Sequence, residues 1–75
     1  MGIVTDEYDQ LRREQYRSLV RLATFLVRDG TVATPIVADS FAALRDTELT
    51  GDAALSFVRR DVVTRSRAWL RRDME

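Results

Sequence analysis

Apolar residues recur every three to four positions along most of this 75-residue chain, which is the spacing of amphipathic helices. The first stretch carries two such ridges: Tyr8, Leu11, Leu19, Leu22 and Leu26, and beside them Tyr16, Val20, Ala23 and Val27. Because two ridges need two packing surfaces, this helix is expected to contact two neighbours. Acids at its start and Gly30 after its end predict a helix over about residues 6–28, with Gly30 as a left-handed C-terminal cap.

Two further helical patterns follow. The second has a clear buried face: Ala33, Ile36, Val37, Ser40, Phe41 and Leu44. Thr34 as N-cap and Pro35 at the first helical position predict a helix over about residues 34–46, whereas a start at Thr31 would leave Pro35 in the first turn. After a polar link, Asp52 can cap a third helix over about residues 53–72.

The third helix has an apolar arc of roughly 140° on a helical wheel. This arc contains Leu55, Val58, Val62, Val63, Ser66, Trp69 and Leu70. Trp69 is therefore expected to pack in the core rather than to stack on a base, whereas Phe57 projects roughly opposite the arc and is the better candidate for an exposed aromatic. Arg59 falls inside the arc, so we expect it to pair with an acid or to reach water at a frayed helix end.

The three patterns predict an all-α fold, a three-helix bundle that forms a single domain over residues 1–75. No stretch shows the period of two that is typical of strands. A chain of this length buries only about 60% of the surface that its unfolded form exposes, so a thin core is expected. Self-association would be one way to cover the remaining apolar surface.

Composition excludes several classes of chemistry. The chain has no Cys and no His, so disulfides, thiolate chemistry, His-based triads and the usual zinc sites are excluded. It has no glycine-rich phosphate loop and no Ser or Thr with a nearby base. We therefore expect no catalytic residue, no metal and no cofactor, and a protein that is not an enzyme. No apolar run approaches the roughly 20 residues of a membrane span, so a soluble cytoplasmic protein without a membrane partner is expected.

Charge is balanced overall but unevenly distributed. The net charge is zero, yet residues 57–75 carry six Arg against Asp61, Asp73 and Glu75, which is +3 and leaves −3 for the rest. Two groups of arginines flank the apolar arc: Arg60, Arg67 and Arg71 on one side, Arg65 and Arg72 on the other. A solvated helix face is the simplest interpretation, and a phosphate-binding surface is the sharper one.

Three motifs resemble region 2 of bacterial extracytoplasmic-function (ECF) sigma factors, most closely those of actinobacteria. They are Tyr16–Ala23 (YRSLVRLA), Ala33–Leu44 (ATPIVADSFAAL) and Phe57–Arg72 (FVRRDVVTRSRAWLRR). The resemblance implies a sigma-factor region 2-like bundle that acts in transcription initiation. Such a domain docks on the clamp helices of the largest subunit of core RNA polymerase and reads the promoter −10 element as a melted DNA strand.

The resemblance also implies site residues. The DNA-binding candidates are Phe57, Arg60, Thr64, Arg65, Arg67, Arg71 and Arg72. The RNA polymerase-binding candidates, on the outer face of the second helix, are Thr34, Ala38, Asp39 and Arg45. An anti-sigma factor is a further candidate partner.

The chain departs from the family pattern where partners would bind. Thr34-Pro35 replaces an acidic pair, Ala38 replaces a Gln, Thr64 replaces an Asn, and Asp61 stands where an apolar residue is common. These departures favour an alternative, a sigma-like protein–protein interaction module that binds polymerase, a sigma regulator or a second copy of itself without reading promoter DNA. The sequence does not include the second, helix-turn-helix domain that would read the −35 element, so an excised domain and a stand-alone protein both stay open.

Overall fold

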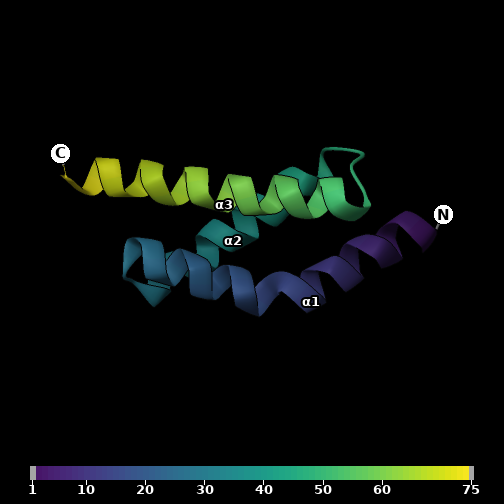
Figure 1. Ribbon diagram of the computed structural model, residues 1–75, viewed down its shortest axis with the longest axis horizontal. Coiled ribbons are helices and arrows are strands. Elements are labelled where there is room, and N and C mark those ends of the chain that lie inside the picture. Colours follow the sequence, from purple (N-terminus) through teal and green to yellow (C-terminus); the bar gives the residue numbers. More distant parts are fainter. Residues whose placement is uncertain (1, 75) are drawn as a thin grey trace.

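The computed structural model describes the backbone of residues 2–74 and the side chains of residues 7–72. It contains three helices, and the described part of the chain has no strand. The helices are α1 (Gly2–Val27), α2 (Gly30–Arg45) and α3 (Gly51–Met74). In Figure 1, α1 and α3 run in the same direction. α2 runs in the opposite direction behind them, from the end of α1 toward the start of α3. Every pair of helices is in contact, which confirms the predicted all-α three-helix bundle.

The junction between α1 and α2 differs from the prediction. Arg28, not Gly30, adopts the left-handed conformation (φ 58°), and its N–H donates to the Thr24 carbonyl at 2.6 Å. Gly30 is instead the first residue of α2. This arrangement is an αL cap, in which one backbone bond closes the last turn of α1, although a side-chain-bearing residue occupies the position that glycine favours.

Asp29 caps α2, so the predicted start at Thr34 was wrong. Its carboxylate accepts from the backbone N–H of Thr31 at 3.0 Å and from the Thr31 hydroxyl at 2.6 Å. These bonds hold the pKa of Asp29 below its usual value. Because the Asp29 carboxylate satisfies the otherwise free Thr31 N–H, the helix begins at Gly30 instead of near Thr34. Pro35 therefore lies inside the helix. Pro35 has no N–H, so its place in the helix leaves one intrahelical bond unmade.

The link between α2 and α3 is closed by side-chain bonds. The Thr47 hydroxyl donates to the Leu44 carbonyl at 2.7 Å and accepts from the Leu49 N–H at 3.2 Å. Gly51 then starts α3 with a positive φ of 61°. Asp52, predicted as the cap, therefore lies within the first turn of α3, where an acid complements the positive end of the helix dipole.

The core is one cluster contributed by all three helices. Its members are Leu19, Ala23, Val27, Ala33, Ile36, Val37, Phe41, Leu44, Ala54, Val58 and Val62. The predicted buried face of α2 is confirmed at each of its six positions. Ser40 and Ser66 are also fully buried, and neither hydroxyl has a hydrogen-bond partner among the described residues.

Tyr8 fixes the first half of α1 against α2. Its hydroxyl donates to the Phe41 carbonyl at 3.2 Å, and its ring meets the Phe41 ring edge-on with centroids 6.1 Å apart. The Arg45 guanidinium lies 5.6 Å from the centroid of the Tyr8 ring on the α2 side. A hydrogen bond, an aromatic pair and a cation–π contact thus join the two helices at one residue.

Candidate nucleic-acid interface

One face of α3 is cationic and exposed. The buried side chains of α3 recur every fourth residue, at Ala54, Val58, Val62 and Ser66. At 100° per residue the opposite side of the helix presents Arg60, Thr64, Arg67 and Arg71, and all four are exposed. At 1.5 Å per residue Arg60 and Arg71 lie about 16 Å apart along the helix axis. We call these four residues the α3 arginine face.

Arg65 is held apart from this face. Its Nε donates to Asp61 Oδ2 at 2.6 Å, the only ion pair among the side chains that the structure describes. Both residues are half-buried. Arg72 is exposed but lies on the Arg65 side of the helix. The seven candidate DNA-binding residues therefore do not form one surface.

Phe57 is not the exposed aromatic that the helical wheel suggested. It is half-buried and packs against the core cluster. Phe57, Asp61 and Arg65 form a row at every fourth position, and all three are half-buried. Val63 and Leu70 at the other edge of the arc are also half-buried, but unlike Phe57 they are not among the side chains packed against the core cluster. Trp69 is half-buried against the core, which confirms its expected packing role.

Arg59 also differs from its prediction. Because the helical wheel places it within the apolar arc, we expected it to pair with an acid or to lie at a frayed helix end. The structure has it exposed in the middle of α3, and no described acid pairs with it. That prediction was wrong, because the Arg59 side chain reaches water directly although its neighbours on the wheel, Ser66 and Leu70, are buried and half-buried.

The candidate polymerase-binding residues lie on the exposed side of α2. Thr34, Ala38, Asp39 and Arg45 are all exposed, as are Pro35 and Ala42 between them. Arg45 differs from the rest, because its guanidinium covers the Tyr8 ring at 5.6 Å. The free part of this surface is therefore small and nearly flat, with Asp39 as its one charged group.

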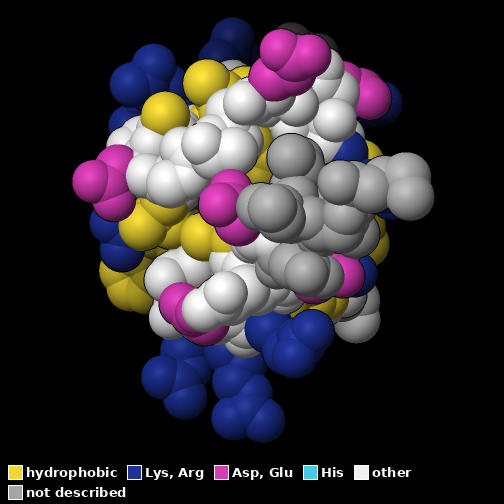
Figure 2. All heavy atoms as spheres, turned by 90° about the vertical axis from the view of Figure 1, so that its right-hand side faces the viewer, with side chains coloured by type: hydrophobic (Ala, Val, Ile, Leu, Met, Phe, Trp, Pro, Cys, Tyr) yellow, Lys and Arg dark blue, Asp and Glu magenta, His cyan; other side chains and the backbone are white. Residues whose placement is uncertain are grey.

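Exposed arginines are not confined to α3. Figure 2 shows cationic side chains at opposite edges of the molecule, including the lower edge, where α1 lies in Figure 1. The exposed arginines of α1 and its C-terminal end are Arg12, Arg13, Arg17, Arg21 and Arg28. The sequence-level division into an acidic part and a basic part therefore does not give a molecule with one basic side.

Phe25 is the feature that the sequence reasoning missed. It is 79% exposed, the most exposed large apolar side chain among the described residues. It lies on α1 opposite the buried row formed by Leu19, Ala23 and Val27. A helical wheel of α1 would have found it, because Phe25 belongs to neither apolar ridge.

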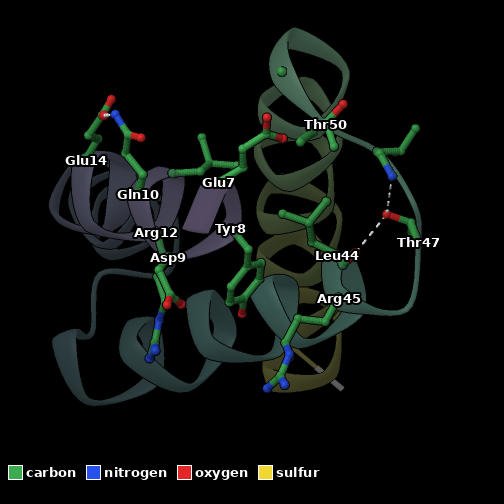
Figure 3. A pocket seen from close by; sticks show the side chains of 14 residues that line it. Glu7, Tyr8, Asp9, Gln10, Arg12, Glu14, Leu44, Arg45, Thr47 and Thr50 are labelled. Carbon is green, nitrogen blue, oxygen red and sulfur yellow. Dashed lines mark hydrogen bonds between the residues drawn. The ribbon is translucent and has the colours of Figure 1, made fainter. Parts of the chain in front are cut away.

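An open groove of about 640 Å³ lies at the end of the bundle where α2 ends and α3 begins. Residues of α1, the end of α2, the link and the start of α3 line it: Glu7, Tyr8, Asp9, Gln10, Leu11, Arg12, Glu14, Leu44, Arg45, Thr47, Leu49, Thr50, Gly51 and Ala54. Figure 3 shows Glu7 extending from α1 toward Thr50 and the link. Because two segments distant in sequence, residues 7–14 and 44–54, build it, no local pattern could reveal this groove.

Within the described part of the chain, no group of three or more carboxylates is placed to hold a metal ion. No helix there is long and apolar enough to cross a membrane. Comparison of the chain with protein-family models, with curated proteins and with solved structures finds no match.

Proposed function

We propose that this chain is a sigma-factor region 2-like domain that binds core RNA polymerase and the melted −10 strand of a promoter, without catalysing a reaction. The observation that carries the proposal is the α3 arginine face. It lies within the motif Phe57–Arg72, the part of the ECF resemblance expected to contact DNA, and it faces away from the core. The three-helix bundle is consistent with such a domain. Work on a promoter would place the protein in the cytoplasm.

Three arginines on one helix face suit a single nucleic-acid strand. Arg60, Arg67 and Arg71 can each neutralise a backbone phosphate, and the Thr64 hydroxyl between them can donate to a phosphate or a base edge. Each phosphate neutralised on a single strand contributes about −0.7 to the slope of log affinity against log salt. Three contacts thus imply a slope near −2, with Arg72 as an added contact at the end of the helix.

Fewer residues than the sequence suggested can contact DNA from the α3 arginine face. Arg65 is paired with Asp61, and the Phe57 ring packs against the core. We therefore assign DNA contact to Arg60, Thr64, Arg67, Arg71 and Arg72. Polymerase contact falls to Thr34, Ala38 and Asp39, where small side chains allow a clamp helix to approach α2 closely.

Two structural observations favour the alternative of a sigma-like interaction module. The packed Phe57 ring leaves the α3 arginine face without an aromatic on which a melted base could stack. The Asp61 carboxylate puts a negative charge one turn from Thr64 and Arg65. In that case the partner is polymerase, an anti-sigma factor or a second copy of the chain.

Co-purification with core RNA polymerase, with and without −10 non-template strand, separates the two functions. Retention on polymerase together with capture of the strand supports the first. Retention without the strand supports the interaction module. Failure to bind polymerase in both conditions contradicts the first function and leaves the interaction module with an anti-sigma factor or a second copy as its partner.

A further inference from the structure

The two exposed large apolar side chains of the described residues lie at opposite ends of the bundle. Phe25, 79% exposed, lies near the C-terminal end of α1, and Leu49, 43% exposed, lies in the link between α2 and α3. In Figure 1 the C-terminal end of α1 lies toward the left and the link between α2 and α3 toward the right of a molecule 44 Å long. Phe25 and Leu49 are therefore too far apart to pack against each other within one chain.

The surface around Phe25 is cationic. Arg21 precedes it by one turn on the same side of α1, and Arg28 follows at the end of the helix; both are exposed. Residues 15–28 contain three arginines and no acid. Aromatic residues, Phe included, and Arg are enriched in protein interfaces relative to the rest of the surface. We call Phe25, Arg21 and Arg28 the Phe25 knob.

The groove that contains Leu49 offers the complementary chemistry. Leu11, Leu44 and Ala54 line it alongside Leu49. Its volume of about 640 Å³ is in the range of sites that enclose a small ligand, ample for one aromatic side chain.

The lining of the groove has more acids than arginines: Glu7, Asp9 and Glu14 against Arg12 and Arg45. Figure 3 shows Glu7 and Glu14 on one side and Asp9, Arg12 and Arg45 on the other. The two guanidiniums on the second side lie over tyrosine rings of the same chain, Arg12 over Tyr16 at 5.7 Å and Arg45 at 5.6 Å. Glu14 Oε1 accepts from Gln10 Nε2 at 2.8 Å, and the Glu7 carboxylate has no partner among the described residues. The first side of the groove therefore presents negative charge to a partner.

We propose that a second copy of this chain occupies the groove, with its Phe25 knob inserted beside Leu49 and its flanking arginines against Glu7 and Glu14. Because knob and groove lie at opposite ends, the contact is heterologous and repeats from copy to copy. A symmetric contact between two knobs would instead bring arginines of like charge together. The head-to-tail contact leaves the outer faces of α2 and α3 uncovered, so it is independent of the proposed function.

Sedimentation equilibrium tests the contact with two blocking variants. Phe25→Ser removes the knob and leaves the groove intact, and Leu49→Arg blocks the groove and leaves the knob intact. Both positions are exposed, so thermal unfolding should be nearly unchanged. Ser18→Ala, another exposed position on α1, is the matched control.

The average mass of the wild-type chain and of the control should rise with concentration beyond two copies. Each blocking variant alone should remain at the 8.6 kDa of one chain. An equimolar mixture of the two variants should form a heterodimer and stop there, because only one knob and one groove remain usable. A wild-type chain that stays monomeric up to millimolar concentration would overturn the proposal. So would self-association that Leu49→Arg leaves intact, since that indicates a symmetric contact through Phe25.

Discussion

Arg65 Nε donates a 2.6 Å hydrogen bond to Asp61 Oδ2, one turn earlier on α3. The two side chains are 40% and 23% exposed, so the pair is partly screened by solvent and contributes only a few tenths of a kcal/mol to folding. Its consequence for binding is larger. It fixes one of the arginines of the motif that we propose binds DNA, and it sets a carboxylate one turn from Thr64.

Asp61→Asn should therefore strengthen binding of single-stranded −10 DNA several-fold. The substitution frees Arg65 and removes a repelling charge, so the salt dependence should steepen by about 0.7 in the log–log slope. Fluorescence anisotropy against salt concentration measures both quantities. Asp52→Asn, an exposed acid in the first turn of the same helix, is the control and should change affinity much less. Equal effects of the two variants would mean that only net charge matters.

Gly51 and Gly30 form a matched pair for backbone strain. Each begins a helix, and a Cβ at either would meet no atom within 4 Å, but only Gly51 has a positive φ, 61°. Gly51→Ala should cost about 1 kcal/mol of unfolding free energy, because left-handed backbone disfavours a Cβ. Gly30→Ala should stabilise by about 0.5 kcal/mol through the unfolded chain. Urea unfolding compares them, and a similar loss in both variants would contradict the assignment of strain to Gly51.

Tyr8→Phe tests the bond between α1 and α2 without removing the ring. The lost hydroxyl donates to the Phe41 carbonyl, so the free energy of unfolding should fall by about 1 kcal/mol. Tyr16→Phe is the control, because the Tyr16 ring meets Arg12 while its hydroxyl makes no bond to a described residue. The same urea titration measures both, and indistinguishable midpoints would argue against the Tyr8 bond.

Asp29 predicts a pH dependence of stability. Hydrogen bonds from Thr31 lower its pKa in the folded chain below the usual value of 3.8, so the folded state favours the carboxylate. The stabilisation is therefore present above that value and is lost as pH falls through the folded pKa. The amide of Asp29→Asn also caps a helix but does not titrate. The difference in melting temperature between wild type and Asp29→Asn should shrink on acidification, and a difference independent of pH would contradict the role of the carboxylate.

The spacing of apolar residues correctly predicted the features that depend on one helix alone. The buried face of α2, from Ala33 to Leu44, was correct because its apolar spacing admits one orientation. The start of α2 was missed because two capping signals compete within a few residues, and the bonds of Asp29 to Thr31 win over Thr34 before Pro35.

The features that the spacing missed depend on how the three helices pack together. Which flank of α3 is covered depends on where α1 and α2 lie, so the wheel alone misplaced Phe57 and Arg59. The same packing half-buries Asp61 and Arg65, and it leaves Arg60, Arg67 and Arg71 exposed together on the side of α3 opposite the core. The sequence thus predicted that α3 carries a row of arginines, but not which of its arginines share one exposed face.

The central claim is that the α3 arginine face, and not cationic charge in general, binds a melted promoter strand. Arg67→Ala/Arg71→Ala removes two exposed arginines from this face. Arg13→Ala/Arg17→Ala removes two exposed arginines from α1 and gives a variant of identical net charge. The measurement is the affinity of each double variant for labelled single-stranded −10 DNA across a series of salt concentrations.

The α3 variant should lose most of its affinity, and its log–log salt slope should flatten by about 1.4, the value for two lost phosphate contacts. The α1 variant should retain the wild-type slope. Equal losses in the two variants, or unchanged binding by the α3 variant, would contradict the claim.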